Sequence, residues 1–129
     1  MPQAGSIAIA DGQSTPVNHT FTPKKLQDGI LAYFEEASGI PAARLNLTVS
    51  VRPPVGTGQM YRAAVSFAVP AVAVVNGIQT VDHTNRVNME FLVHQNSTDA
   101  EMKNLFAFAK NGLGNAQIAE AVTTLSPFY

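Results

Sequence analysis

Residues 44–52 alternate polar and apolar side chains without interruption. The apolar residues occupy the odd positions, which are Leu45, Leu47, Val49 and Val51. A period of two places odd and even residues on opposite faces of a β-strand, one buried and one solvated. The stretches 61–69 and 86–93 also keep apolar residues at odd positions. If these strands lie in one antiparallel sheet, its odd-numbered face is apolar and its even-numbered face carries hydroxyl, amide and guanidinium groups.

All four arginines of the chain fall on the even-numbered face, at Arg44, Arg52, Arg62 and Arg86, while the four lysines lie elsewhere in the sequence. With Glu90, four positive charges against one negative charge leave +3 on this face, although the whole chain carries −1. Arginine is suited to bidentate contacts with phosphates and base edges. The pattern is typical of a nucleic-acid-binding face, and it fits equally a solvated face whose charges maintain solubility.

A length of 129 residues predicts one domain, 1–129, that can bury a sizeable core. Because only 13% of the residues are charged and 46% are hydrophobic, we expect much of the surface to contact other protein. The lack of cysteine excludes disulfides and cysteine-ligated metals. The chain opens without a signal-peptide pattern and has no apolar run of membrane-spanning length, which predicts a cytosolic protein with no membrane partner.

Two β-hairpins are indicated by short turn signals. Asp11-Gly12 separates two strand-like stretches within 5–21, and Asn76-Gly77 separates 71–75 from 78–81. The second hairpin is apolar on both sides of its turn, which is unusual for an exposed hairpin of a monomer. It therefore predicts an intersubunit contact through Val74, Val75, Asn76, Gly77 and Ile78.

Residues 22–39 give conflicting local signals. Thr22-Pro23 resembles the start of a helix, and apolar residues recur every four positions at Leu26, Ile30 and Phe34. Asp28-Gly29 instead reads as a turn, and residues 30–34 are rich in β-favouring types. These local signals alone favour a helix by a small margin.

The C-terminal segment, 96–129, predicts two helices. Thr98 and Glu101 form a capping box, and apolar residues follow at helical spacing, namely Met102, Leu105, Phe106 and Ala109. Gly112 and Gly114 are stop signals, and a second short helix is expected at about 116–125. A hairpin at 1–21, a sheet at 22–95 and helices at the end make an α+β fold.

Neither catalysis nor metal binding finds support in the sequence. His19, His83 and His94 lack the spacing of a metal site, and Asp82-His83 lies beside a hairpin with no evident nucleophile. We therefore expect a protein that is not an enzyme and that binds no metal or cofactor.

The order of several segments resembles the coat proteins of single-stranded RNA bacteriophages, the levivirus type. The matching segments cover nearly the whole chain: Asp28-Gly29-Ile30, residues 48–52, Val69-Pro70, residues 86–90, residues 96–101 and the ending at 125–129. The resemblance implies an N-terminal hairpin, a five-stranded antiparallel sheet and two C-terminal helices. It also implies an interlocked, obligate dimer with a ten-stranded sheet, in which the helix residues Met102, Leu105, Phe106 and Ala109 face the partner.

The resemblance further implies a shell protein of the virion. Such dimers assemble in the bacterial cytoplasm into a quasi-equivalent icosahedral shell around the single-stranded RNA genome. The same sheet surface binds an RNA hairpin at the replicase start site and represses translation. The family positions that contact RNA fall on Ile30, Thr48, Ser50, Arg52, Arg62, Ser66, Arg86, Asn88 and Glu90. Residues near 30–36 should accordingly form a strand rather than a helix.

The chain departs from the family pattern at two of these positions. Ser66 stands where the family often has lysine, and Arg86 stands where it often has a tyrosine that stacks on a base. The guanidinium plane of Arg86 could stack instead. The alternating pattern also fits a function from another class. In this alternative, the protein is a cytosolic α+β dimer that binds a small ligand on its sheet.

Overall fold

The computed structural model describes residues 4–27, 30–36 and 43–128. The chain forms two compact units that divide between Leu92 and Val93. The first unit contains the sheet, and the second contains the helices.

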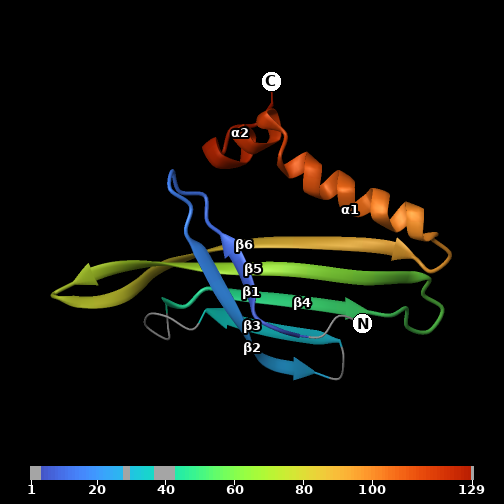
Figure 1. Ribbon diagram of the computed structural model, residues 1–129, viewed down its shortest axis with the longest axis horizontal. Helices are drawn as coiled ribbons and strands as arrows, with labels where there is room; N and C mark the ends of the chain where they lie inside the picture. The colour runs from blue at the N-terminus through green and yellow to red at the C-terminus, as the bar shows by residue number, and fades with distance from the viewer. Residues whose placement is uncertain (1–3, 28–29, 37–42, 129) are drawn as a thin grey trace. The chain divides into compact units, whose positions relative to one another are not determined.

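In the described residues, six strands form one sheet whose order in space is their order along the chain (Figure 1). They are β1 (Ile7–Ala10), β2 (Asn18–Gln27), β3 (Leu31–Glu36), β4 (Asn46–Arg52), β5 (Met60–Val75) and β6 (Ile78–His94). The family resemblance implied an N-terminal hairpin and a five-stranded sheet. The hairpin strand β2 continues to Gln27 and pairs with β3, so the hairpin and the sheet are one six-stranded layer.

The register confirms the alternation that the sequence predicted. Leu47 of β4 lies directly opposite Phe67 of β5, and Thr48 lies opposite Ser66. Odd-numbered residues of both strands therefore share one face, since directly opposite residues in an antiparallel pair point to the same side. The buried core lies on this odd-numbered face, where Leu47 joins Phe21 and Phe34. Phe21 packs edge-on against Phe67, with 6.1 Å between the ring centroids.

The local helix signals at 22–39 were wrong for the described part of this segment. Residues up to Gln27 lie in β2 and Leu31–Glu36 form β3; residues 28–29 and 37–39 are outside the described residues. The hydroxyl of Thr22, which resembled a helix cap, donates instead to the carbonyl of Glu35 across the sheet, at 3.1 Å. Pairing with neighbouring strands thus overrides a weak local preference.

The register of β2 shifts between Pro23 and Lys25. Proline has no N–H to donate to the sheet, so a bulge beside it is the expected accommodation. The shift changes which residues of β2 share a face, because it inserts one residue into the alternation. Phe21 lies opposite Glu36, whereas Lys25 lies opposite Tyr33.

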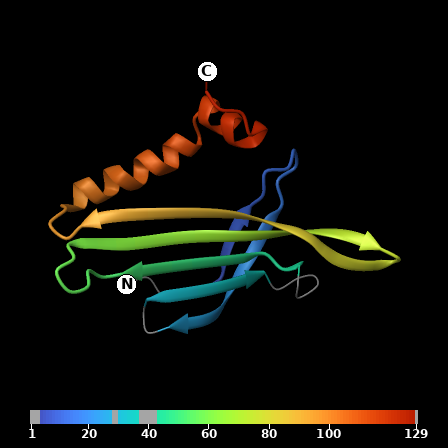
Figure 2. The ribbon, with the colours of Figure 1, turned by 180° about the vertical axis from the view of Figure 1, so that it is seen from behind.

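Strands β5 and β6 extend beyond the rest of the sheet (Figure 2). The pairing of β4 with β5 ends at Ala68, so the part of the β5–β6 hairpin near its turn has no β4 neighbour. The turn residues Asn76 and Gly77 both have positive φ, 51° and 76°. This is the type I′ geometry that Asn-Gly predicted.

The second unit contains α1 (Asp99–Leu113) and α2 (Ala116–Thr124). The predicted capping box is present: the amide of Glu101 donates to the Thr98 hydroxyl, and the amide of Thr98 donates to the Glu101 carboxylate. Asn115 caps α2 through its side-chain oxygen, which accepts from two backbone amides. Both helices lie wholly within the described residues, and neither has a buried residue. Among those residues, no helix is long and apolar enough to cross a membrane.

Candidate RNA-binding face

One row of side chains crosses the sheet from β3 to β5. Thr48 of β4 lies directly opposite Tyr33 of β3 on one side and Ser66 of β5 on the other. All three therefore point to the same side of the sheet. By the same rule, this side carries the odd-numbered residues of β3 and the even-numbered residues of β4 and β5. We call it the polar face; it is opposite to the face that carries the core.

Two arginines meet at one end of the polar face. Arg52 of β4 pairs directly with Arg62 of β5, and both side chains are exposed. Like charges directly opposite each other are unfavourable in a sheet. Glu90 of β6 offsets part of the repulsion, since its Oε1 lies 3.8 Å from Nη1 of Arg62. One carboxylate against two guanidinium groups leaves a positive charge that attracts anions such as phosphate.

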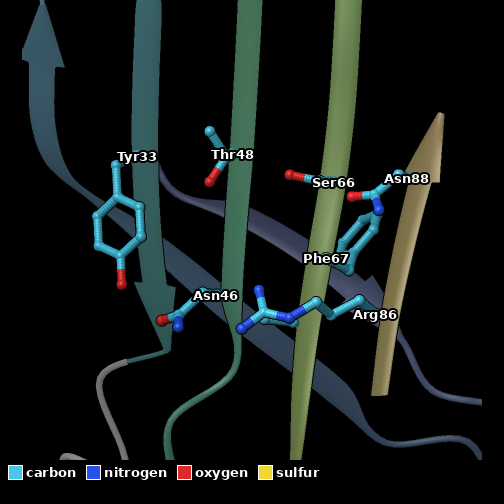
Figure 3. A pocket seen from close by; sticks show the side chains of 8 residues that line it. Tyr33, Asn46, Thr48, Ser66, Phe67, Arg86 and Asn88 are labelled. Atoms are coloured by element: carbon cyan, nitrogen blue, oxygen red, sulfur yellow. The ribbon is translucent and has the colours of Figure 1, made fainter. Parts of the chain in front are cut away.

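A hollow opens on the polar face along the central row, whose three residues all line it (Figure 3). About 340 Å³ of empty space lies in and above it, and part of this space is open solvent. Four strands contribute its lining: Tyr33, Asn46, Thr48, Ser66, Phe67, Ala68, Arg86 and Asn88. The polar groups among these residues are hydroxyls, amides and one guanidinium, and they include no carboxylate. The hollow is therefore suited to an uncharged polar ligand or to an anion.

The surroundings of Tyr33 disfavour ionisation of its phenol. Burial is the main cause that raises the pKa of Tyr33 above its ordinary value, and the charge of Glu35 adds to the effect. Glu35 is itself paired with Arg44, whose Nη1 lies 3.6 Å from Oε1 of the carboxylate. Tyr33 contributes a hydroxyl donor and an aromatic ring to the lining of the hollow.

Most of the predicted RNA-binding residues lie together on the polar face. Four of them line the hollow, namely Thr48, Ser66, Arg86 and Asn88. Ser50, Arg52 and Arg62 share the same face outside the hollow, and Glu90 contacts Arg62. Their arrangement is compatible with one continuous contact surface.

Ile30 is the exception among the predicted residues. It lies in the turn before β3, and its carbonyl accepts a hydrogen bond from the amide of Val51 at 2.8 Å. The register instead places Leu31 opposite Ser50 on the polar face.

The predicted RNA-binding residues did not include three further residues of the polar face, Tyr33, Asn46 and Lys25. Tyr33 and Asn46 line the hollow, and Lys25 lies opposite Tyr33. Asn46 was visible as an even-numbered residue of its strand. Tyr33 was obscured because the helix-like pattern at 22–39 hid the alternation of β3. Lys25 could not be found by parity, since the register shift after Pro23 changes its face.

The residues that were predicted to contact other subunits, in the β5–β6 hairpin and on α1, are largely exposed. In the β5–β6 hairpin, Val74 and Ile78 are each 66% exposed. On α1, Met102, Leu105 and Phe106 are exposed, whereas Ala109 is half-buried. Phe108 was not among the predicted residues, yet it is 76% exposed. Apolar surface of this kind is typical of protein that contacts further protein.

Among the described residues, no group of three or more His, Asp or Glu side chains is placed to hold a metal ion. Asp82 and His83 do contact each other, with 2.7 Å between Oδ2 and Nδ1. Both side chains are more than half exposed, at 65% and 57%.

Comparison with known proteins agrees with this architecture. The levivirus coat protein family matches residues 2–129. The capsid protein of Pseudomonas phage PRR1 is 29% identical over 115 residues, which cover 86% of each chain. The virus-like particle of Beihai levi-like virus 21 contains a chain with a TM-score of 0.90 and 28% identity, over 99% of both chains. The virus-like particle of bacteriophage ESE058 gives a TM-score of 0.88 and 28% identity, over 99% of this chain and 100% of that one.

The family match extends over nearly every residue, including both units of the fold. It favours a self-associating capsid protein over the small-ligand-binding alternative. The sheet with two C-terminal helices is likewise the fold of these coat proteins. The chain therefore belongs to the levivirus coat protein family, whose members are structural proteins of virus particles and not enzymes.

Proposed function

We propose that this coat protein forms obligate dimers that assemble, in the cytoplasm of a bacterial host, into an icosahedral shell around single-stranded RNA. The same protein binds an RNA hairpin through its polar face and represses translation from the replicase start site. Family membership and the two virus-like particles support the shell. The polar face supports RNA binding.

Support for the dimer comes from the small amount of apolar surface that one chain buries. Among the described residues, the buried hydrophobic core consists of Phe21, Phe34 and Leu47. Each such side chain contributes about 1.5–3 kcal/mol when fully buried, which is little against the entropy of ordering a chain of this length. The exposed apolar side chains of α1 are available to a second subunit. Obligate dimers of this kind bury more than roughly 2,000 Å².

The observation that carries the RNA proposal is the direct pairing of Arg52 with Arg62 on the same face as a hollow without carboxylates. Two opposed guanidinium groups are unfavourable alone and favourable once a phosphate lies between them. The hydroxyls and amides of the hollow suit the edges of unpaired bases, which is how proteins usually read RNA loops. Backbone contacts would thus hold the RNA, and the hollow would select it.

One preparation of purified protein tests both halves of the proposal. Electron microscopy distinguishes uniform closed particles from small oligomers, and dimers released from particles can be titrated with RNA. We expect uniform particles, and dimers that bind a hairpin selected from a pool with randomised loops more tightly than a fully paired duplex. Small oligomers alone would contradict the shell. Equal affinity for every RNA, or none for any, would contradict hairpin recognition.

A further inference from the structure

Lys25 stands at the end of the central row of the polar face. It lies directly opposite Tyr33 of β3, and the row continues through Thr48 of β4 to Ser66 of β5. Residues directly opposite each other in antiparallel strands point to the same side of a sheet. The ammonium group of Lys25 therefore belongs to the polar face, on a strand that carries none of the predicted RNA-binding residues.

The shift of register in β2 brings Lys25 to this side of the sheet. Just before the shift, Pro23 lies opposite Phe34, a residue of the core. In an uninterrupted strand Lys25 would share the side of Pro23, because side chains alternate with a period of two. The shift reverses this alternation, so Lys25 leaves the core face and joins the polar face. Bulges of this kind are over-represented next to functional sites, where they re-aim a side chain.

The positive charge of Lys25 is exposed and free to attract an anion. Among the described residues, no carboxylate lies within ion-pair distance of its ammonium group. The acid on the polar face of β3 is Glu35, and it is already paired with Arg44 at 3.6 Å. An anion that reaches this end of the central row therefore meets positive charge.

A wide gap separates Lys25 from the opposed pair of Arg52 and Arg62. Two strand spacings of about 4.8 Å and four residues of about 3.4 Å each put the Cα atoms of Lys25 and Arg52 roughly 17 Å apart. Side chains of a strand stand roughly perpendicular to the sheet, so these two cannot share one phosphate across that separation. The polar face thus has positive charge at two separate places, one on β2 and one at the end of β4 and β5.

This arrangement suits a chain of phosphates better than a single small anion. A lone exposed lysine holds a free anion weakly, since isolated surface ion pairs contribute little. A polyanion that is already bound at Arg52 and Arg62 differs, because its further phosphates meet Lys25 at a high effective concentration. Each such contact also releases condensed counterions and so adds to the affinity.

We infer that Lys25 binds a backbone phosphate of the RNA, separate from the phosphate at Arg52 and Arg62, so that the RNA crosses the polar face from β4 and β5 to β2. This inference rests on the proposed RNA binding, and it extends the contact surface to a further strand. It also gives the bulge in β2 a function, since the bulge aims a phosphate contact.

Lys25→Gln tests the contact through the salt dependence of binding between intact dimers and a hairpin selected from a pool with randomised loops. One lost phosphate contact should lower the slope of log affinity against log salt concentration by about 0.7–0.9. The difference in affinity from wild type should therefore shrink about threefold when the salt concentration rises fourfold. Lys25→Arg keeps the charge and should follow wild type. Lys103→Gln removes an equal charge from α1 and should leave the slope unchanged.

A neutral backbone then identifies the phosphate. The selected hairpin is remade with a methylphosphonate, which lacks the negative charge, at each backbone position in turn. We expect one position at which neutralisation weakens binding to wild type but has no further effect on Lys25→Gln. A different position should behave in this way with Arg52→Ala. One shared position for both variants, or none for Lys25→Gln, would overturn the inference.

The outcomes separate this inference from the proposed function. If wild type prefers no hairpin from the pool, RNA hairpin recognition is wrong and the inference falls with it. If Arg52→Ala lowers the salt slope while Lys25→Gln keeps the slope of wild type, RNA binding by the polar face stands and the contact on β2 is wrong. The melting temperature of Lys25→Gln should equal that of wild type, because the side chain is exposed.

Discussion

His19 Nδ1 lies 2.8 Å from Oε1 of Glu36, so the imidazole joins β2 to β3. The other ring nitrogen, Nε2, lies 3.0 Å from Oδ2 of Asp11, in the turn between β1 and β2. Asp11 also accepts hydrogen bonds from the backbone amides of Gln13 and Val17. One histidine thereby connects two carboxylates, and through them it ties the N-terminal turn to the sheet.

The pKa values of this cluster predict how its contribution to stability depends on pH. The hydrogen bond with Glu36 is the main cause that raises the pKa of His19 above 6.5. Stability from His19 is therefore fully present below pH 6.5 and is lost as the pH rises through the raised pKa. The Val17 amide is the main cause that lowers the pKa of Asp11 below 3.8, so its contribution is present above pH 3.8 and is lost in stronger acid.

We therefore expect His19→Gln to destabilise the protein most between about pH 4 and pH 6.5. The difference in melting temperature from wild type should shrink as the pH rises further, because neutral imidazole can donate to only one of the two carboxylates. Melting curves across this range give the measurement. His83→Gln is the matched control, since it removes an exposed histidine from β6. A pH-independent difference between wild type and His19→Gln would rule out this role.

The apolar side of α1 is expected to be essential for the dimer. Leu105→Asp should give insoluble or unfolded protein, because an unpaired charge would replace an apolar side chain at the interface. Asn104→Asp is the matched control: it adds the same charge one residue earlier and should leave the dimer intact. Solubility and size-exclusion chromatography provide the measurement. A soluble, folded monomer from Leu105→Asp would refute the interlocked dimer.

The β5–β6 hairpin is expected to control assembly and not folding. Val74, Val75 and Ile78 are exposed on the part of the hairpin that has no β4 neighbour. Replacing these three with serine should leave a dimer whose melting temperature is close to that of wild type, since little burial is lost within one chain. Complete particles should no longer form under the electron microscope. Gln79→Ser is the control at the same tip, and normal particles from the triple variant would show that the hairpin does not direct assembly.

The alternation at 44–52 was enough to predict β4 and the side of the sheet that carries the polar residues. The prediction succeeded because β4 buries only the face that carries Leu47 and Val49. No local signal in this stretch favours a helix or a turn instead. The same reasoning failed for β3, where Phe34 and its neighbours recur at helical spacing but are held by pairing with β2 and β4. Lys25 shows a second limit of this reasoning. A register shift depends on pairing with the neighbouring strand, so it cannot be recognised from whether a residue number is odd or even. The hollow needed four strands in register, so of its lining residues only Thr48, Ser66, Arg86 and Asn88 were among the predicted RNA-binding residues.

The functional residues of the polar face are expected to divide into two groups when RNA binding is measured against salt. Arg52→Ala and Arg62→Ala should each weaken binding to every RNA. Each lost phosphate contact should also lower the slope of log affinity against log salt concentration by about 0.7–0.9. Thr48→Val keeps the shape of the side chain and removes its hydroxyl. It should reduce discrimination at an unpaired base and leave the salt slope unchanged.

A salt series on intact dimers, with a selected hairpin and a scrambled one, separates these two effects. None of the substitutions should disturb the dimer, because the core lies on the opposite, odd-numbered face of β4 and β5. Lys110→Ala, near the end of α1, is a matched control: it removes one positive charge from outside the polar face and should leave the slope as in wild type. If the two arginine variants bind as tightly as wild type at every salt concentration, the polar face is only a solvated surface. The RNA would then have to be held by another part of the protein, and the opposed pair of Arg52 and Arg62 would need a different explanation.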